Sequence, residues 1–124
     1  MKKIEKEEVY NRWKNLVNMS ATELRRYYNS ADGLTSGLSA AAGKKLGVKT
    51  GRQSARALLK MIPTGKTFTR AVNNWTSSDW EWAKRQVSFI SRMKNVPGPL
   101  FRQDGTRYKK LKSLLIWGYN PEKA

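Results

Sequence analysis

Apolar side chains recur at intervals of three and four residues through most of this chain, which is the spacing of one face of an α-helix. The pattern is clearest at Trp80, Ala83, Val87 and Ile90, in the segment expected to form the longest helix. No regular alternation of apolar and polar residues extends over a strand of ordinary length. The pattern therefore predicts an all-α fold, a compact bundle of five or six helices in a single domain over residues 1–124.

Capping residues, glycine and proline set the expected helix boundaries. Ser or Thr precedes five of the periodic runs and is expected to cap each helix through its side-chain oxygen: Ser20, Ser39, Thr50, Thr76 and Thr106. Gly47 is expected in the left-handed conformation that ends a helix. The predicted helices cover about 3–17, 20–30, 40–46, 51–62, 77–94 and 107–117, and a short segment at 68–75 also has helical spacing.

The connections between these helices are predicted to be short. Asp32 and Gly33 are expected to end the second helix, and Leu46 is expected to face inward from the short third one. After the longest helix, a short extended piece at 100–101 leads into a tight turn at 103–105. None of these connections is long enough to separate two domains.

Positive charge is the strongest signal in the composition. The chain has 25 Lys and Arg against 9 Asp and Glu, a formal net charge of +16 at pH 7. A charge of this size opposes compaction and attracts polyanions, whether nucleic acid, an acidic protein or an anionic membrane surface. With no Cys and no His, the chain lacks the usual ligands of zinc and other transition metals, so we expect no metal and no cofactor.

The chain has no secretory signal pattern, because charged residues follow the initial methionine directly. No apolar run approaches the ~20 residues needed to span a membrane. The sequence therefore predicts a cytoplasmic protein with no membrane partner.

The basic residues are concentrated on one predicted helix. Segment 33–78 contains eight Lys or Arg and no acid. At 100° per residue, four of these fall within an arc of about 80°, and the apolar side of the helix is centred roughly 120° away. They are Lys49, Arg52, Arg56 and Lys60, with Lys44, Lys45, Lys109, Lys110 and Lys112 expected to flank them. The predicted function is nucleic-acid binding through this face, mainly by phosphate contacts, with double-stranded DNA favoured over RNA.

The helices at 40–46 and 51–62 resemble a helix–turn–helix pair. Gly47 and Val48 fit the turn of such a motif, but Gln53 and Arg56 fall where its second helix needs apolar residues. A turn about two residues longer than usual would correct the register. We therefore expect a helix–turn–helix-like pair rather than the standard motif, and an ordinary pair of core helices is the alternative.

Other kinds of chemistry have weak support. The acidic residues are scattered, so the chain is predicted not to be an enzyme, with a small Mg²⁺-dependent nuclease as a minor alternative. Gly65 and Lys66 lack the spacing of a phosphate-binding loop. The tryptophans at 75, 80 and 82 are predicted to lie in the core, although exposure of Trp82 or Phe101 would favour base stacking.

A family resemblance rests on the run Trp80–Met93, on Gly98-Pro99-Leu100 and on Trp117-Gly118. On these residues the chain resembles small uncharacterised basic proteins encoded by phages and other large DNA viruses, over roughly residues 16 to 121. The resemblance implies a viral setting and brings no known fold or activity. In that setting the second hypothesis is a protein–protein module, either a host-factor inhibitor or an internal virion protein that docks on an acidic host or capsid protein.

Overall fold

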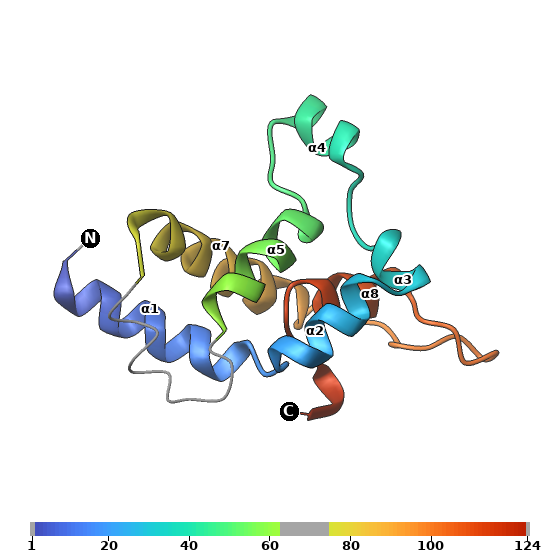
Figure 1. The fold of residues 1–124 in the computed structure, drawn as a ribbon. Helices are drawn as coiled ribbons and strands as arrows, with labels where there is room; N and C mark the ends of the chain where they lie inside the picture. The colour runs from blue at the N-terminus through green and yellow to red at the C-terminus, as the bar shows by residue number, and fades with distance from the viewer. Residues whose placement is uncertain (1, 63–74, 124) are drawn as a thin grey trace.

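The computed structural model describes residues 2–62 and 75–123, and its fold is all-α, as predicted. The α-helices of the described residues, followed by a final 3-10 turn, are α1 (Lys3–Leu16), α2 (Ala21–Tyr28), α3 (Ala31–Leu34), α4 (Ala40–Leu46), α5 (Gly51–Met61), α7 (Ser77–Met93), α8 (Lys109–Ile116) and η1 (Pro121–Lys123). Of the segment predicted at 68–75, residues 68–74 lie outside the described part. In Figure 1, α1 lies along α7, while α2, α5 and α8 pack together beside them.

Four of the five predicted N-caps are confirmed. Ser20, Thr50 and Thr76 each form a full capping box, and the side chain of Ser39 accepts a hydrogen bond from the backbone N–H of Ala42. These caps satisfy backbone N–H groups that the first turn of a helix leaves unpaired. The helix starts were predictable because each cap uses only residues within three positions of itself.

Thr106 does not cap the last helix, which was predicted to begin there. Its backbone N–H and its hydroxyl both donate to the carboxylate of Asp104, at 2.9 and 2.6 Å. This pairing closes a tight hairpin in which Phe101 and Arg107 form an antiparallel bridge. The helix α8 starts later, after Tyr108, without a side-chain cap. The predicted turn and the extended piece before it are confirmed.

The second helix is shorter than predicted, because a further helix follows it. The helix α2 ends at Tyr28, and Ser30 then caps α3 by accepting from the backbone N–H of Gly33 at 3.0 Å. A Cβ on Gly33 would lie 1.9 Å from the carbonyl oxygen of Tyr27, so only glycine fits this close approach. Asp32 and Gly33 therefore lie inside a helix rather than in a terminating turn.

The helices α5 and α8 hold the bundle together, because α5 packs against α2, α7 and α8, and α8 packs against α2, α3, α5 and α7. Leu58 on α5 is completely buried, as are Leu24 on α2, Ile90 on α7 and Leu114 on α8. The helices α4 and α5 do not form the helix–turn–helix-like pair that was predicted, because α4 is not among the helices that pack against α5.

A buried polar chain crosses the core and joins three helices. The indole Nε1 of Trp13 on α1 donates to the side-chain oxygen of Gln86 on α7 at 2.7 Å. The amide nitrogen of Gln86 in turn donates to the hydroxyl of Ser54 on α5 at 3.2 Å. All three side chains are fully buried. Since buried polar groups are costly without partners, these bonds fix how α1, α7 and α5 face one another.

The helix α4 stands away from the bundle on an arm, defined here as residues 35–50 (Figure 1). Leu46 was predicted to face inward, but it is 64% exposed because no other helix covers α4. Gly47 ends α4 in the predicted left-handed conformation, with φ of 70°. The arm therefore carries apolar and basic side chains outside the core.

Candidate nucleic-acid interface

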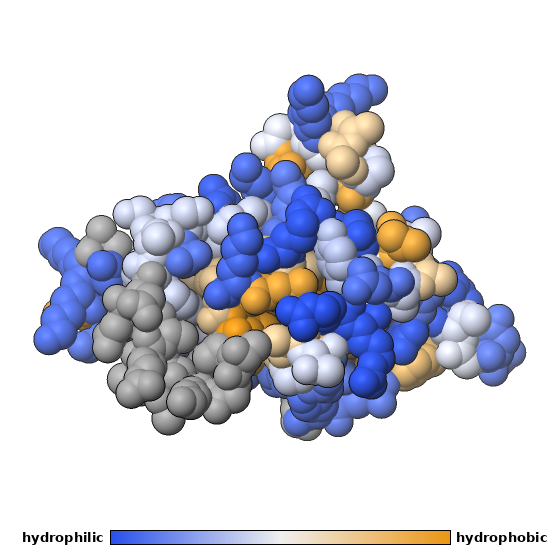
Figure 2. All heavy atoms as spheres, in the orientation of Figure 1, coloured by the Kyte–Doolittle hydropathy of each residue, from blue (hydrophilic) through white to orange (hydrophobic). Residues whose placement is uncertain are grey.

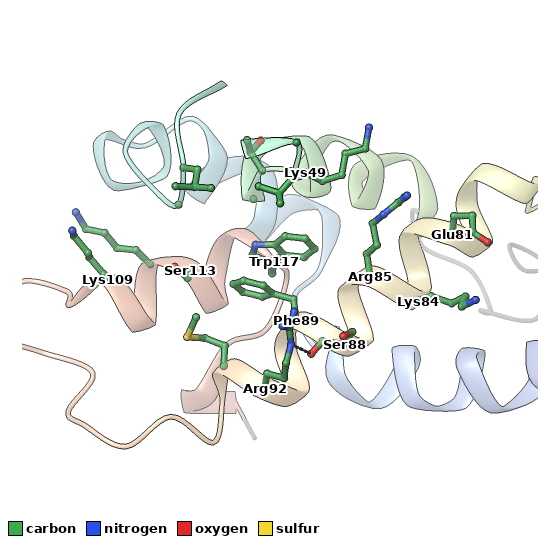
Figure 3. A pocket seen from close by; sticks show the side chains of 18 of the residues that line it. Lys49, Glu81, Lys84, Arg85, Ser88, Phe89, Arg92, Lys109, Ser113 and Trp117 are labelled. Atoms are coloured by element: carbon green, nitrogen blue, oxygen red, sulfur yellow. Dashed lines mark hydrogen bonds between the residues drawn. The ribbon is translucent and has the colours of Figure 1, made fainter. Parts of the chain in front are cut away.

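A large groove lies between the arm, α7 and α8, and its accessible volume is about 1170 Å³. One wall is formed by the first and last residues of the arm, including Leu38 and Val48. The other walls are the exposed sides of α7 and α8 (Figure 3). Three segments far apart in the sequence therefore form one concave surface.

The floor of the groove is aromatic. The rings of Phe89 on α7 and Trp117 at the end of α8 are stacked, with centroids 4.3 Å apart and planes 15° from parallel (Figure 3). Gly51 lies against Trp117, and a Cβ there would be 3.1 Å from the indole Nε1 and 2.5 Å from Ile116. Glycine at position 51 thus lets α5 approach α8 closely, which holds the indole in place. Trp117 is only 6% exposed, whereas Phe89 is half-buried.

Cations surround this floor. The Lys and Arg residues that line the groove are Lys49, Lys84, Arg85, Arg92, Lys109 and Lys112. Glu81 is the only acid among the described residues that line it. Such an excess of one sign creates a positive potential in the groove, which concentrates anions there.

Three of these cations are lysines that are free to bind a ligand. Lys49, Lys84 and Lys109 have no hydrogen bond or ion pair within the described ranges 2–62 and 75–123. They come from the arm, α7 and α8 respectively, and Figure 3 shows each amino group extending away from the ribbon that carries it. These three lysines are called the rim lysines below.

The remaining rim cations on α7 follow helical spacing. Arg85 and Arg92 lie about one turn and three turns along the same face from Glu81, with Ser88 between them. The guanidinium of Arg85 lies 5.3 Å from the ring centre of Trp82, and Nε of Arg92 donates to its own helix at the carbonyl of Ser88. Neither guanidinium is neutralised by an acid in the described part of the chain. The repeat of 81, 85, 88 and 92 was readable in the sequence, but these residues were not among the predicted binding residues.

The structure divides the predicted binding residues among different places. Lys49, Lys109 and Lys112 line the groove, whereas the other predicted residues do not. Lys49 precedes the Thr50 cap, so it is not a helical residue and does not belong to the face predicted for α5. The exposed Lys60 lies near the end of α5.

Arg52 has a structural task that the sequence did not show. Its Nη1 donates to the backbone carbonyls of Tyr28 at 3.0 Å and of Gly33 at 2.9 Å, and its guanidinium lies 3.8 Å from the centre of the Tyr28 ring. The half-buried guanidinium thus satisfies carbonyls at the end of α2 and in α3. The exposed Arg56 donates to the Tyr28 hydroxyl at 2.9 Å, and this bond lowers the pKa of that phenol. The basic face predicted for α5 is therefore partly used within the fold.

Lys112 and Lys110 on α8 are also engaged. The ammonium of Lys112 lies 3.6 Å from the carboxylate of Asp32, which also binds Arg107 at 2.6 Å. The hydrogen bond from Arg107, with the charge of Lys112, lowers the pKa of Asp32. The ammonium of Lys110 donates to the carbonyl of Val96. Lys112 therefore contributes less uncompensated charge to the groove than Lys109 does.

Lys44 and Lys45 are exposed on α4, outside the groove. Figure 2, seen from the same side as Figure 1, shows hydrophilic residues over much of the described surface and at the tip of the arm, where they lie beside apolar ones. Leu38, Leu46 and Val48 are exposed apolar side chains of this arm. The arm can therefore present charge and apolar surface together.

Of the three tryptophans predicted to lie in the core, Trp80 is buried, and Trp75 and Trp82 are half-buried and pack against the core. Trp75 packs edge to face on both Trp13 and Trp80, with ring centres 4.9 and 4.8 Å apart. Phe101, in contrast, is 40% exposed on the hairpin between α7 and α8, the exposure expected to favour base stacking, but it does not line the groove. The accessible aromatic ring at the groove, Phe89, was not singled out as a stacking residue, because its pattern along α7 marks only an apolar position.

Within residues 2–62 and 75–123, no three acidic side chains lie together in a way that could hold a metal ion. None of the helices described there has the length and apolar character required to cross a bilayer. Searches against protein-family models, curated proteins and solved structures found no match. The resemblance to small viral proteins stays a prediction, and the function is argued from the geometry and charge of this chain.

Proposed function

We propose that this protein is a non-enzymatic nucleic-acid-binding protein whose groove contacts phosphates. The observation that carries the proposal is that the unpaired rim lysines, which come from three separate elements, all line one groove. Lys and Arg contacts to phosphate supply most of the affinity of sequence-independent binding. DNA stays the expected nucleic acid, and a cytoplasmic location, in the host cell if the setting is viral, stays a prediction.

The proposal moves the main contact surface away from α5. The sequence predicted that Arg52 and Arg56 would contact phosphate, but Arg52 is held by two backbone carbonyls and Arg56 by a phenol. A cation that already satisfies buried carbonyls gains less from a phosphate, because it must leave those partners. Lys49, Lys84 and Lys109 pay no such cost.

A salt titration tests this proposal. Labelled oligonucleotides of mixed sequence, single-stranded and duplex, are titrated with the protein at several salt concentrations. We expect binding at micromolar protein or better and an affinity that falls steeply with salt, as counterion release requires. A flat salt response, or no binding of either oligonucleotide at micromolar protein and low salt, would refute the proposal.

Docking on an acidic protein is the second candidate, favoured by one observation. The exposed Leu34, Leu46 and Val48 lie close together in the sequence, on α3 and the arm. Exposed apolar side chains at a basic surface suit a partner that is acidic and partly apolar. A complex with an acidic protein that survives nuclease treatment, together with failure of the titration above, would select this candidate.

A further inference from the structure

We propose that the groove takes single-stranded nucleic acid, with phosphates on the rim lysines and a base against the ring of Phe89. This inference rests on the proposed function and names the form of nucleic acid that the same groove accepts. It starts from a mismatch between the groove and a duplex. The groove combines a charged rim with an apolar floor, whereas a duplex keeps the faces of its bases stacked inside the helix.

The size of the groove points to a segment of polymer. Its volume of about 1170 Å³ exceeds the ~300–1,000 Å³ of most small-molecule pockets. If the phosphates of a duplex bound the rim, the floor would face the hydrated surface of the DNA. The apolar floor would then have no apolar group to contact. A single strand exposes the π-faces of its bases, which stack on aromatic side chains irrespective of sequence.

Phe89 is placed to provide such a stacking surface. Its ring is supported by the indole of Trp117, at a centroid distance of 4.3 Å, and the indole is in turn held against Gly51. A ring fixed in this way loses little conformational freedom when a base stacks on it. Arg85 and Arg92 lie one turn before and after this position on α7, so their guanidinium groups can reach phosphates on either side.

The composition of the rim favours nucleic acid over a protein partner. Lysine is depleted at protein–protein interfaces, whereas interfaces with nucleic acids are far more positively charged. Half of the six cations at this groove are lysines without an acidic or hydrogen-bond partner in the described ranges. An acidic helical peptide is therefore treated as the competing occupant, and the experiment below includes it.

The decisive comparison uses the unaltered protein and three probes of about twelve nucleotides, a length within the ~4–16 that one binding module occupies. They are a thymidine single strand, an abasic strand with the same number of phosphates, and a duplex. We expect the thymidine strand to bind about tenfold or more tightly than the abasic strand, since a stacked base contributes that much. We also expect it to bind more tightly than the duplex.

Phe89→Leu provides the matched test of the floor, since leucine keeps the site apolar but has no ring. It should lose most of the difference between the thymidine and abasic strands, while Phe101→Leu, an exposed ring outside the groove, should keep it. Equal binding of thymidine and abasic strands by the unaltered protein would overturn this inference and leave the phosphate-based function standing. Absence of binding to all three probes would overturn both. Tighter binding of an acidic Glu/Leu helical peptide at the same salt would assign the groove to a protein partner.

Discussion

Neutralising the rim lysines should remove a defined part of the salt dependence of binding. The variant carries Lys49→Gln, Lys84→Gln and Lys109→Gln. None of these amino groups has an internal partner in the described residues, so the exchange removes charge without breaking a contact of the fold. Stability should change little, because exposed substitutions of this kind usually stay within about 0.5 kcal/mol.

The expected magnitude follows from counterion release. Each phosphate neutralised by a cation contributes about −0.7 to the slope of log K against log salt for a single strand and about −0.9 for a duplex. If each rim lysine neutralises one phosphate, the slope should become shallower by about 2.1 on a single strand or about 2.7 on a duplex. If the three lysines contribute nothing to affinity at 1 M salt, the variant should bind a single strand about 100-fold more weakly than the unaltered protein at 0.1 M salt.

The assay is fluorescence anisotropy at four or more salt concentrations, with a charge-matched control. The control carries Lys3→Gln, Arg25→Gln and Arg26→Gln, which removes the same charge from exposed positions outside the groove. Because exposed charges are screened beyond about 10 Å at 0.1 M salt, the control should keep nearly the full slope. Equal losses in the two variants would refute the groove as the contact surface and would leave only a general effect of net charge.

Two further predictions concern the fold that supports the groove. Gln86→Met should lower the free energy of unfolding by about 1–3 kcal/mol in urea titrations, because the thioether replaces neither the hydrogen bond from Trp13 nor that to Ser54. As a control, Gln103→Met at an exposed position should change this free energy by less than about 0.5 kcal/mol. Equal effects of the two substitutions would contradict the role of the buried polar chain. The pKa of Asp32 is lowered in the folded state by Arg107, so its contribution to stability is present above its ordinary value of 3.8 and is lost as the pH falls through the lower folded value. Stability should therefore decrease below about pH 4, less steeply in Asp32→Asn than in the unaltered protein; identical acid profiles would show that the ion pair contributes nothing.

Local signals predicted most of the helices. The capping boxes at Ser20, Thr50 and Thr76 were recognisable because donor and acceptor lie three residues apart. Thr106 failed for an equally local reason, since Asp104 offers it a carboxylate that competes with the role of helix cap. A Ser or Thr is thus predictable as a helix cap when no neighbouring carboxylate binds its hydroxyl and its backbone N–H.

Contacts between residues that lie far apart in the sequence could not be predicted. The apolar period of α4 indicated a buried side for Leu46, but periodicity cannot say whether another helix arrives to cover it. Gln86 was similarly invisible, because its partners Trp13 and Ser54 lie 73 and 32 residues away. The groove depends on such long-range placement, since its walls come from the arm, α7 and α8.

How much a basic residue can contribute to binding depends on whether it already has a hydrogen-bond or ion-pair partner within the fold. Helical spacing placed Arg52 on the predicted contact face, yet its guanidinium is held by carbonyls 19 and 24 residues away. Lys84 had no special place in the same pattern, yet it stands unpaired at the groove. A sequence shows where charge is, whereas only the fold shows which charge is still available. The free cations, rather than the most regularly spaced ones, therefore define the surface on which a polyanion should bind.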